Sequence, residues 1–172
     1  EGSTANDINE YCKTILQGCP NVDDLVAMKI ANDVSLKEGY EMKKGFSNAL
    51  ADYYEAYVRT MKFDSKAVEA INDWCDEHTE GMIPEIIKKI PDGACLFALN
   101  ALYFKGEWAN KFEKKDTEKA DFTNIDGSKS KTQMMQKEDW FDYTSNDMFA
   151  TVRLPYGNGS YGMYVLLPHE GK

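Results

Sequence analysis

Apolar residues recur every three or four positions in three stretches of the chain, and this spacing predicts amphipathic helices. The first helix is expected over residues 6–17, with Asp7 as its cap, and the second over residues 41–54. The third has the clearest apolar stripe, and we expect it to start with Ser65 as its cap and to end at Gly81. The core-facing residues of this third helix are Ala67, Val68, Ile71, Trp74, Cys75 and His78.

Other stretches are continuously apolar or alternate in polarity, which predicts strands. Residues 25–34 are mostly apolar and are expected to form a strand buried on both faces, whereas residues 57–63 alternate. Residues 94–104 are almost all apolar, and periodicity alone does not separate a buried helix from a buried strand there. The turn at residues 91–93 favours a long central strand, in which Asn100 would be a buried amide that needs a hydrogen-bond partner.

The C-terminal part of the chain has a β pattern. A strand around Phe122 runs into the turn signal Asp126-Gly127, and residues 131–136 are the expected return strand. Another strand is expected to begin at Trp140. A second hairpin is expected from two strands and a glycine-rich tip, at residues 149–155, 162–168 and 156–160. Together, the pattern predicts an α+β fold in a single domain over residues 1–172.

Length and composition agree with a globular domain and narrow the function classes. The chain has 172 residues, of which 42% are hydrophobic, so it can bury a core. A formal charge of -9 argues against a nucleic-acid partner and against binding to an anionic membrane surface. We expect no membrane span, because no apolar run approaches about 18 residues, and the first residues lack the apolar core of a signal peptide.

The residues that could carry chemistry are few. Four cysteines form no CxxC pair, and with two histidines they predict no metal site and no cofactor. Cys12 and Cys19 could form a disulfide, whereas Cys75 and Cys95 lie in apolar patterns and are expected as small core residues. Cys75 and His78 could form a catalytic dyad on one helix face, but a packed pair fits the apolar stripe better. No hydrolase or nucleotide-binding motif is present, so we predict that the protein is not an enzyme.

One block of the chain carries a family resemblance. Residues 100–108 read NALYFKGEW, and with Phe112 and Thr117 they resemble the signature of the serpins, a family of serine protease inhibitors. The remaining matches occur in the order of that family, at Ala31-Asn32, Phe63-Asp64, residues 71–74, residues 79–83, Phe122, Gly127, Met134-Met135, Phe141, Tyr143, residues 154–156, Met163 and residues 166–168. The resemblance therefore covers essentially the whole chain.

The resemblance implies a fold and a fragment. It implies a serpin-like α+β fold, with helices packed on a large mixed β-sheet and a second, antiparallel β-sheet. Serpins are more than twice as long as this chain, so we expect a central piece of the fold within residues 1–172. The reactive-centre loop, and with it the bond that a target protease attacks, is expected beyond Lys172.

The resemblance also implies roles for six residues. Serpins inhibit when a protease cleaves the reactive loop, forms an acyl-enzyme, and is carried along as the loop inserts into the large sheet. By position, Asn100 matches the shutter that opens for the loop, and Trp108 and Thr117 match the breach where entry begins. The helix with Asn72, Trp74 and Thr79 matches the helix that must move while the loop passes. Plain core packing explains each of these residues equally simply.

Partners and alternatives follow from the same resemblance. It implies a serine or cysteine protease as target of the full-length protein and an extracellular location, while the fragment alone should inhibit nothing. A non-inhibitory serpin, such as a carrier, chaperone or storage protein, fits these residues equally well. An enzyme with an unrecognised site at His78 is a third hypothesis. Because the long apolar strand would lack a neighbour, we also expect self-association or a companion fragment.

Overall fold

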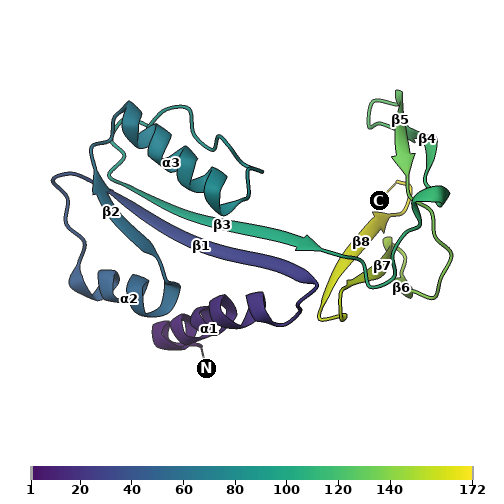
Figure 1. The fold of residues 1–172 in the computed structure, drawn as a ribbon, viewed down its shortest axis with the longest axis horizontal. Helices are drawn as coiled ribbons and strands as arrows, with labels where there is room; N and C mark the ends of the chain where they lie inside the picture. Colours follow the sequence, from purple (N-terminus) through teal and green to yellow (C-terminus); the bar gives the residue numbers. More distant parts are fainter. Residues whose placement is uncertain (1, 172) are drawn as a thin grey trace. The chain divides into compact units, whose positions relative to one another are not determined.

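The computed structural model describes residues 2–171, and the chain divides into two units, Glu1–Lys105 and Gly106–Lys172. The first unit contains all the α-helices and a three-stranded sheet, and the second unit contains antiparallel β structure (Figure 1). This content confirms the predicted α+β class. The expected single partial domain over residues 1–172 stays a prediction.

The sheet of the first unit is mixed. It has the strand order β2-β1-β3, with β1 at Val26–Lys37, β2 at Tyr57–Met61 and β3 at Leu96–Gly106. β1 and β2 are parallel, and Ser35 lies opposite Arg59 in their register. β3 runs antiparallel to β1, because the Lys37 N–H bonds the Cys95 carbonyl while Asn100 lies beside Asn32 further along the pair.

The three predicted helices are present, with α1 at Ala5–Gly18, α2 at Lys44–Tyr54 and α3 at Ser65–His78. The predicted N-caps of α1 and α3 are wrong, by one turn and by one residue respectively. Thr4 caps α1, and Asp7 completes a capping box with it from inside the first turn. Asp64, not Ser65, caps α3 by accepting the N–H groups of Lys66 and Ala67.

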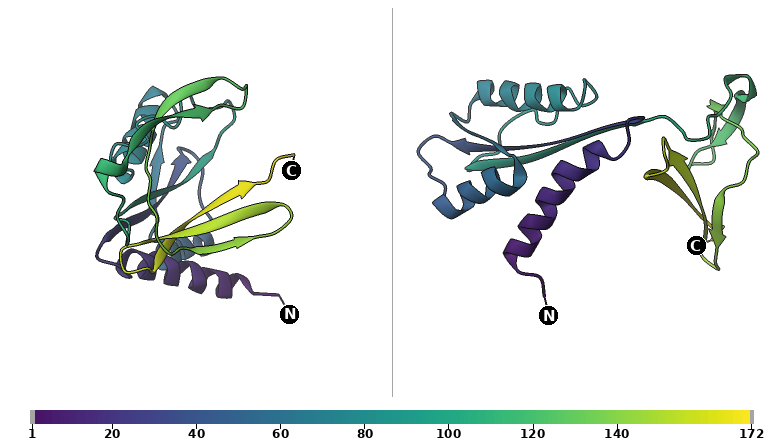
Figure 2. Two further views of the ribbon diagram at one scale, coloured as in Figure 1. Left: turned by 90° about the vertical axis from the view of Figure 1, so that its right-hand side faces the viewer. Right: turned by 60° about the horizontal axis from the view of Figure 1, so that its bottom comes forward.

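α3 lies on one face of the sheet, and α1 and α2 lie on the other (Figures 1 and 2). Trp74 and Cys75 of α3 pack against Ala101 of β3, with Ala31 and Leu99 beside them. On the other face, the Asn32 side chain reaches the last carbonyl of α2, at Tyr54, and the Tyr54 hydroxyl reaches Asn9 of α1. The alternation of side chains along a strand therefore decides which helix each strand residue meets.

Burial in this unit is more local than the sequence predicts. In β1, Val26 and residues 33–36 are buried, whereas residues 27–32 are half-buried or exposed, so the expectation of a strand buried on both faces over residues 25–34 is wrong for most of that stretch. Cys75 is buried as expected, but Cys95 is exposed because it precedes β3, outside the α3 contact. All four cysteines are thiols in the structure.

The second unit consists of a hairpin and a three-stranded antiparallel sheet. The hairpin pairs β4 at Glu118–Thr123 with β5 at Lys129–Met134, and Gly127 in its turn has a φ of 80°. The sheet has the order β6-β7-β8, with strands at Asp142–Ser145, Phe149–Tyr156 and Tyr161–Pro168. Both predicted hairpins are therefore confirmed. Short 3₁₀ turns at Cys19–Asn21 and Lys114–Asp116 complete the elements.

Candidate functional site

Asn100 is exposed, so the prediction of a buried amide is wrong. Ala101 next to it faces α3, and Asn100 consequently points to the opposite face of the sheet. Its Nδ2 donates to the Asn32 side-chain oxygen at 3.0 Å and to the Ala31 carbonyl at 3.4 Å. Because Asn32 in turn donates to the Tyr54 carbonyl at 2.8 Å, the amide of Asn100 joins β3 to β1 and to the end of α2.

Trp108 lies in the second unit at a point where two segments meet. Its ring stacks on Tyr156 with centroids 4.4 Å apart and contacts Phe112 edge-on at 5.9 Å. Around it, the Ala109 N–H bonds the Pro155 carbonyl and the Gly157 N–H bonds the Glu107 carbonyl. Trp108 therefore fixes the chain after β3 against the end of β7.

Thr117, the other predicted breach residue, lies at the end of the 3₁₀ turn Lys114–Asp116, and its N–H bonds the Lys114 carbonyl. It is half-buried there and leads directly into β4. Its contacts are thus those of a turn residue, and its proposed role at the breach stays a prediction.

The three candidates on α3 and at its C-terminal end, Asn72, Trp74 and Thr79, make two kinds of contact. Trp74 packs on the sheet and stacks on His78, with ring centroids 4.5 Å apart. Asn72 instead holds the segment after the helix: its side chain accepts the Ile86 and Ile87 N–H groups and donates to the Ile87 carbonyl. The buried Thr79 hydroxyl donates to the Cys75 carbonyl at 2.6 Å and accepts the Ile83 N–H at 3.0 Å.

These hydrogen bonds hold the segment that follows α3, up to Ile87, against the helix. Gly81 closes the helix end with a φ of 77°, and its N–H bonds the Asp76 carbonyl. A movement of α3 away from the sheet would therefore carry the segment up to Ile87 with it.

Cys75 and His78 do not form an activated dyad. Burial is the largest cause that raises the pKa of the Cys75 thiol, with the Asp33 carboxylate adding to it, whereas a nucleophilic cysteine needs a lowered pKa. Nδ1 of His78 lies 2.8 Å from the Trp74 carbonyl, within its own helix. Within residues 2–171, no group of three or more His, Cys, Asp or Glu side chains could hold a metal ion. No helix of that part is long and apolar enough to cross a membrane.

A buried polar cluster that was not predicted from the sequence lies below α3, formed by Asp33 and Ser35 of β1 and Arg59 of β2. Asp33 and Ser35 are both 0% exposed. The Ser35 hydroxyl donates to Asp33 Oδ1 at 2.7 Å, and Arg59 Nε lies 3.0 Å from Asp33 Oδ2. Burial, the largest cause, raises the pKa of Asp33, although the Ser35 hydrogen bond and the Arg59 charge lower it. The sequence offered one signal for this cluster, which is that the polar residues Asp33 and Ser35 lie two positions apart in or next to a mostly apolar stretch.

The matches to known proteins cover the whole chain. The model of the family described as Serpin (serine protease inhibitor) matches residues 1–172. The chain belongs to the serpin family. Serpin-Z10 of Arabidopsis thaliana is 31% identical over an alignment of 172 positions, which covers 95% of this chain and 44% of that protein. The chain thus spans less than half the length of the relatives that it matches.

Solved serpin structures confirm the fold. Tengpin, a thermophilic serpin, matches in its native state with a TM-score of 0.90 and 31% identity over 99% of this chain and 44% of its own. The structure of a loop C-sheet serpin polymer matches with a TM-score of 0.86 and 30% identity, over 95% of this chain and 44% of that one. The helices, the mixed sheet and the antiparallel sheet described above are therefore the corresponding portion of the serpin fold.

Proposed function

We propose that the full-length protein is an inhibitory serpin that traps a serine or cysteine protease through cleavage of its own reactive loop. Family membership over the whole chain is the observation that carries this proposal. The protein acts as a substrate that stops the protease, not as a catalyst. We further propose that it works outside the cell.

The chemistry belongs to the protease, and the serpin supplies the mechanical step. The protease nucleophile attacks the carbonyl carbon at the reactive bond, the amide C–N bond breaks, and the new amino group takes the nucleophile's proton. This leaves an ester or thioester between the two proteins. Insertion of the cut loop as a strand then separates the acyl bond from the groups that would hydrolyse it.

The first unit has features suited to strand insertion. Among the described residues, β3 at Leu96–Gly106 is the edge strand of the order β2-β1-β3, the kind of position at which a further strand can add to a sheet. Asn100 lies midway along this strand and already joins β3 to β1 through Asn32. We propose that this amide changes partners when the sheet opens, and that Trp108 fixes the chain that follows β3 during entry.

The proposal is tested with the full-length protein and a panel of serine and cysteine proteases. An inhibitor gives a covalent complex that survives denaturing electrophoresis, and its cleaved form unfolds at a higher temperature than the native form. Cleavage by every protease without complex formation and without this gain in thermal stability would overturn the proposal in favour of a non-inhibitory serpin.

A further inference from the structure

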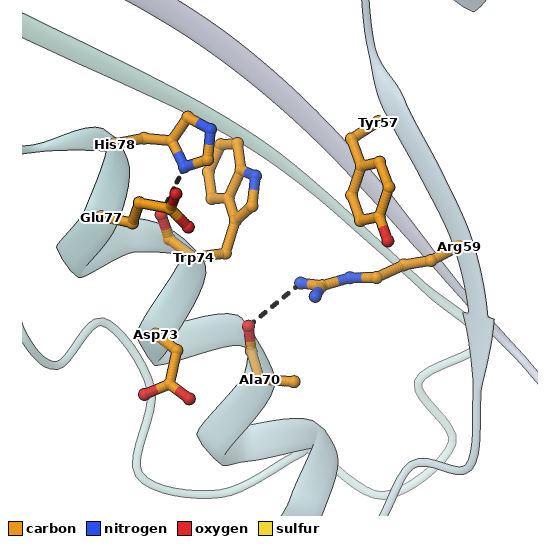
Figure 3. Close-up of a pocket in the computed structure, with 7 residues that line it drawn as sticks. All are labelled: Tyr57, Arg59, Ala70, Asp73, Trp74, Glu77 and His78. Carbon is orange, nitrogen blue, oxygen red and sulfur yellow. Dashed lines mark hydrogen bonds between the residues drawn. The ribbon is translucent and has the colours of Figure 1, made fainter.

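Arg59 joins three elements of the first unit through one side chain. From β2, its Nε donates to the Ser35 hydroxyl of β1 at 2.9 Å and lies 3.0 Å from the Asp33 carboxylate. Its Nη2 donates to the Ala70 carbonyl of α3 at 3.2 Å (Figure 3). We call Asp33, Ser35, Arg59 and the Ala70 carbonyl the Arg59 cluster.

The carboxylate of this cluster depends on Arg59. Within the described residues, Asp33 Oδ2 accepts no hydrogen bond, because the Nε proton of Arg59 is directed to Ser35. Oδ2 is nevertheless buried, and the Arg59 guanidinium is the cation that lies beside it, with Nε 3.0 Å away. The other groups that act on Asp33 are Ser35 of the same strand and His78 of α3, and Asp33 in turn acts on Cys75.

A cavity of about 520 Å³ lies beside the cluster, between α3 and β2. Tyr57 and Trp74 flank it, and the Arg59 side chain crosses between the strand and the helix at its side (Figure 3). On this side, α3 is therefore held by the hydrogen bond of Arg59 to Ala70, whereas Trp74 and Cys75 pack directly on Ala101 of β3.

An exposed ion pair also links the sheet to the residue that follows α3 by two positions. Lys29 of β1 bonds Glu80 just after the helix, but their side chains are 57% and 46% exposed. Water and salt screen such a pair, so it adds little to the attachment of the helix. Arg59, whose side chain is 17% exposed, is therefore the stronger attachment of α3 to the sheet.

We propose that Arg59 is a positioning residue that fixes α3 to the sheet and controls how readily the helix moves away from it. When α3 moves away, Arg59 loses the Ala70 carbonyl, and water reaches a guanidinium that was partly buried and a carboxylate that was fully buried. This inference deepens the proposed function, since α3 is the helix that would have to yield to an inserting strand, but its test does not depend on inhibition.

The test compares hydrogen–deuterium exchange in α3 and in α1 of the full-length protein. Arg59→Met keeps the apolar stem and removes the donors. We expect exchange of the α3 amides to rise by about tenfold more than exchange of the α1 amides, the ratio that corresponds to the loss of one charge-assisted hydrogen bond, because a loss of global stability raises exchange in both helices alike. Lys29→Met is the matched control, because it removes an exposed ion pair between β1 and Glu80, just after α3, and it should leave α3 exchange unchanged.

Arg59→Lys keeps the inference testable if the methionine variant does not fold. A lysine retains the charge near Asp33 but has one nitrogen in place of the Nε and Nη2 that reach Ser35 and Ala70. Exchange in α3 should therefore still rise, but by less than in Arg59→Met. Unchanged α3 exchange in the folded variants would overturn the inference. An equal rise in α1 and α3 would also overturn it, because it would reveal a general loss of stability. If the full-length protein inhibits no protease but Arg59→Met still raises exchange selectively in α3, the proposed function is wrong and the inference about Arg59 holds.

Discussion

Removing the Arg59 side chain should make the stability of the full-length protein depend on pH in a specific way. Asp33 is 0% exposed, and Arg59 is the cation beside it, at 3.0 Å. Arg59→Met leaves a buried carboxylate without a counter-charge, which costs about 3–5 kcal/mol near neutral pH. Ser35 continues to donate to Oδ1, so the carboxyl keeps one partner.

The sign follows from the pKa of Asp33. Burial already raises this pKa above its ordinary value in the folded protein, which means that the folded state favours the protonated carboxyl. The contribution of this site to stability is therefore greatest below the unfolded pKa and is lost as pH rises through the folded one. Arg59 lowers the pKa, so its removal raises it further and extends the loss to higher pH.

Denaturant unfolding of both proteins at about pH 7 and about pH 5 measures the effect. The destabilisation caused by Arg59→Met should shrink as the pH falls, because protonation of Asp33 removes the unpaired charge. Lys131→Met is a suitable control, because Lys131 pairs with Asp121 and their side chains are 66% and 43% exposed, so its loss should cost at most about 1 kcal/mol at either pH. A penalty for Arg59→Met that is constant, or larger at the lower pH, would refute the reasoning.

Three further predictions concern the other candidate residues and the chain itself. Asn100→Ala removes the 3.0 Å bond to Asn32, so it should cost about 0.5–1.5 kcal/mol and speed polymer formation on heating, as seen on native gels. Trp108→Ala removes the stack on Tyr156, so it should destabilise the full-length protein by at least about 1 kcal/mol in denaturant unfolding, and Trp108→Phe by less. Residues 1–172 expressed alone should self-associate in light scattering, because β3 is an edge strand among the described residues and residues such as Leu102 and Leu166 are more than half exposed.

Each of these predictions has a clear contrary result. An unchanged polymerisation rate for Asn100→Ala would separate the amide from sheet opening and leave it a local strand contact. Equal stability of the alanine and phenylalanine variants at Trp108 would show that the ring stack contributes nothing. A monodisperse monomer of residues 1–172 at high concentration would show that the exposed strand is protected in another way.

Much of the secondary structure could be predicted because its signals are local. The period of apolar residues fixed α3 to within a few residues, and Asp126-Gly127 marked a hairpin turn where Gly127 has a φ of 80°. Caps were less predictable, since Thr4 and Asp64 differ from their neighbours mainly in backbone geometry. The family resemblance was also readable from the sequence, because it rested on the block of residues 100–108 and on short matches in the family's order along the chain.

The errors share a different cause, which is that burial depends on residues distant in the sequence. Asn100 and Cys95 both lie in or beside an apolar run, yet both are exposed. The sequence shows that a strand is apolar, but the strand's neighbours and the helix that covers one face decide which side chains lose water. Ala101 meets α3, and Asn100, one position away, faces the other side.

The sequence by itself determined the helices, the hairpins and the serpin family, because each depends on short-range patterns along the chain. Only the tertiary structure decided that Asp33, Ser35 and Arg59 form a buried cluster under α3. That cluster requires the parallel register of β1 and β2, which sets Ser35 opposite Arg59, and the placement of Ala70 within 3.2 Å of the guanidinium. No local pattern encodes a pairing across 24 residues, since it arises only when packing of the apolar residues brings the two strands and the helix together.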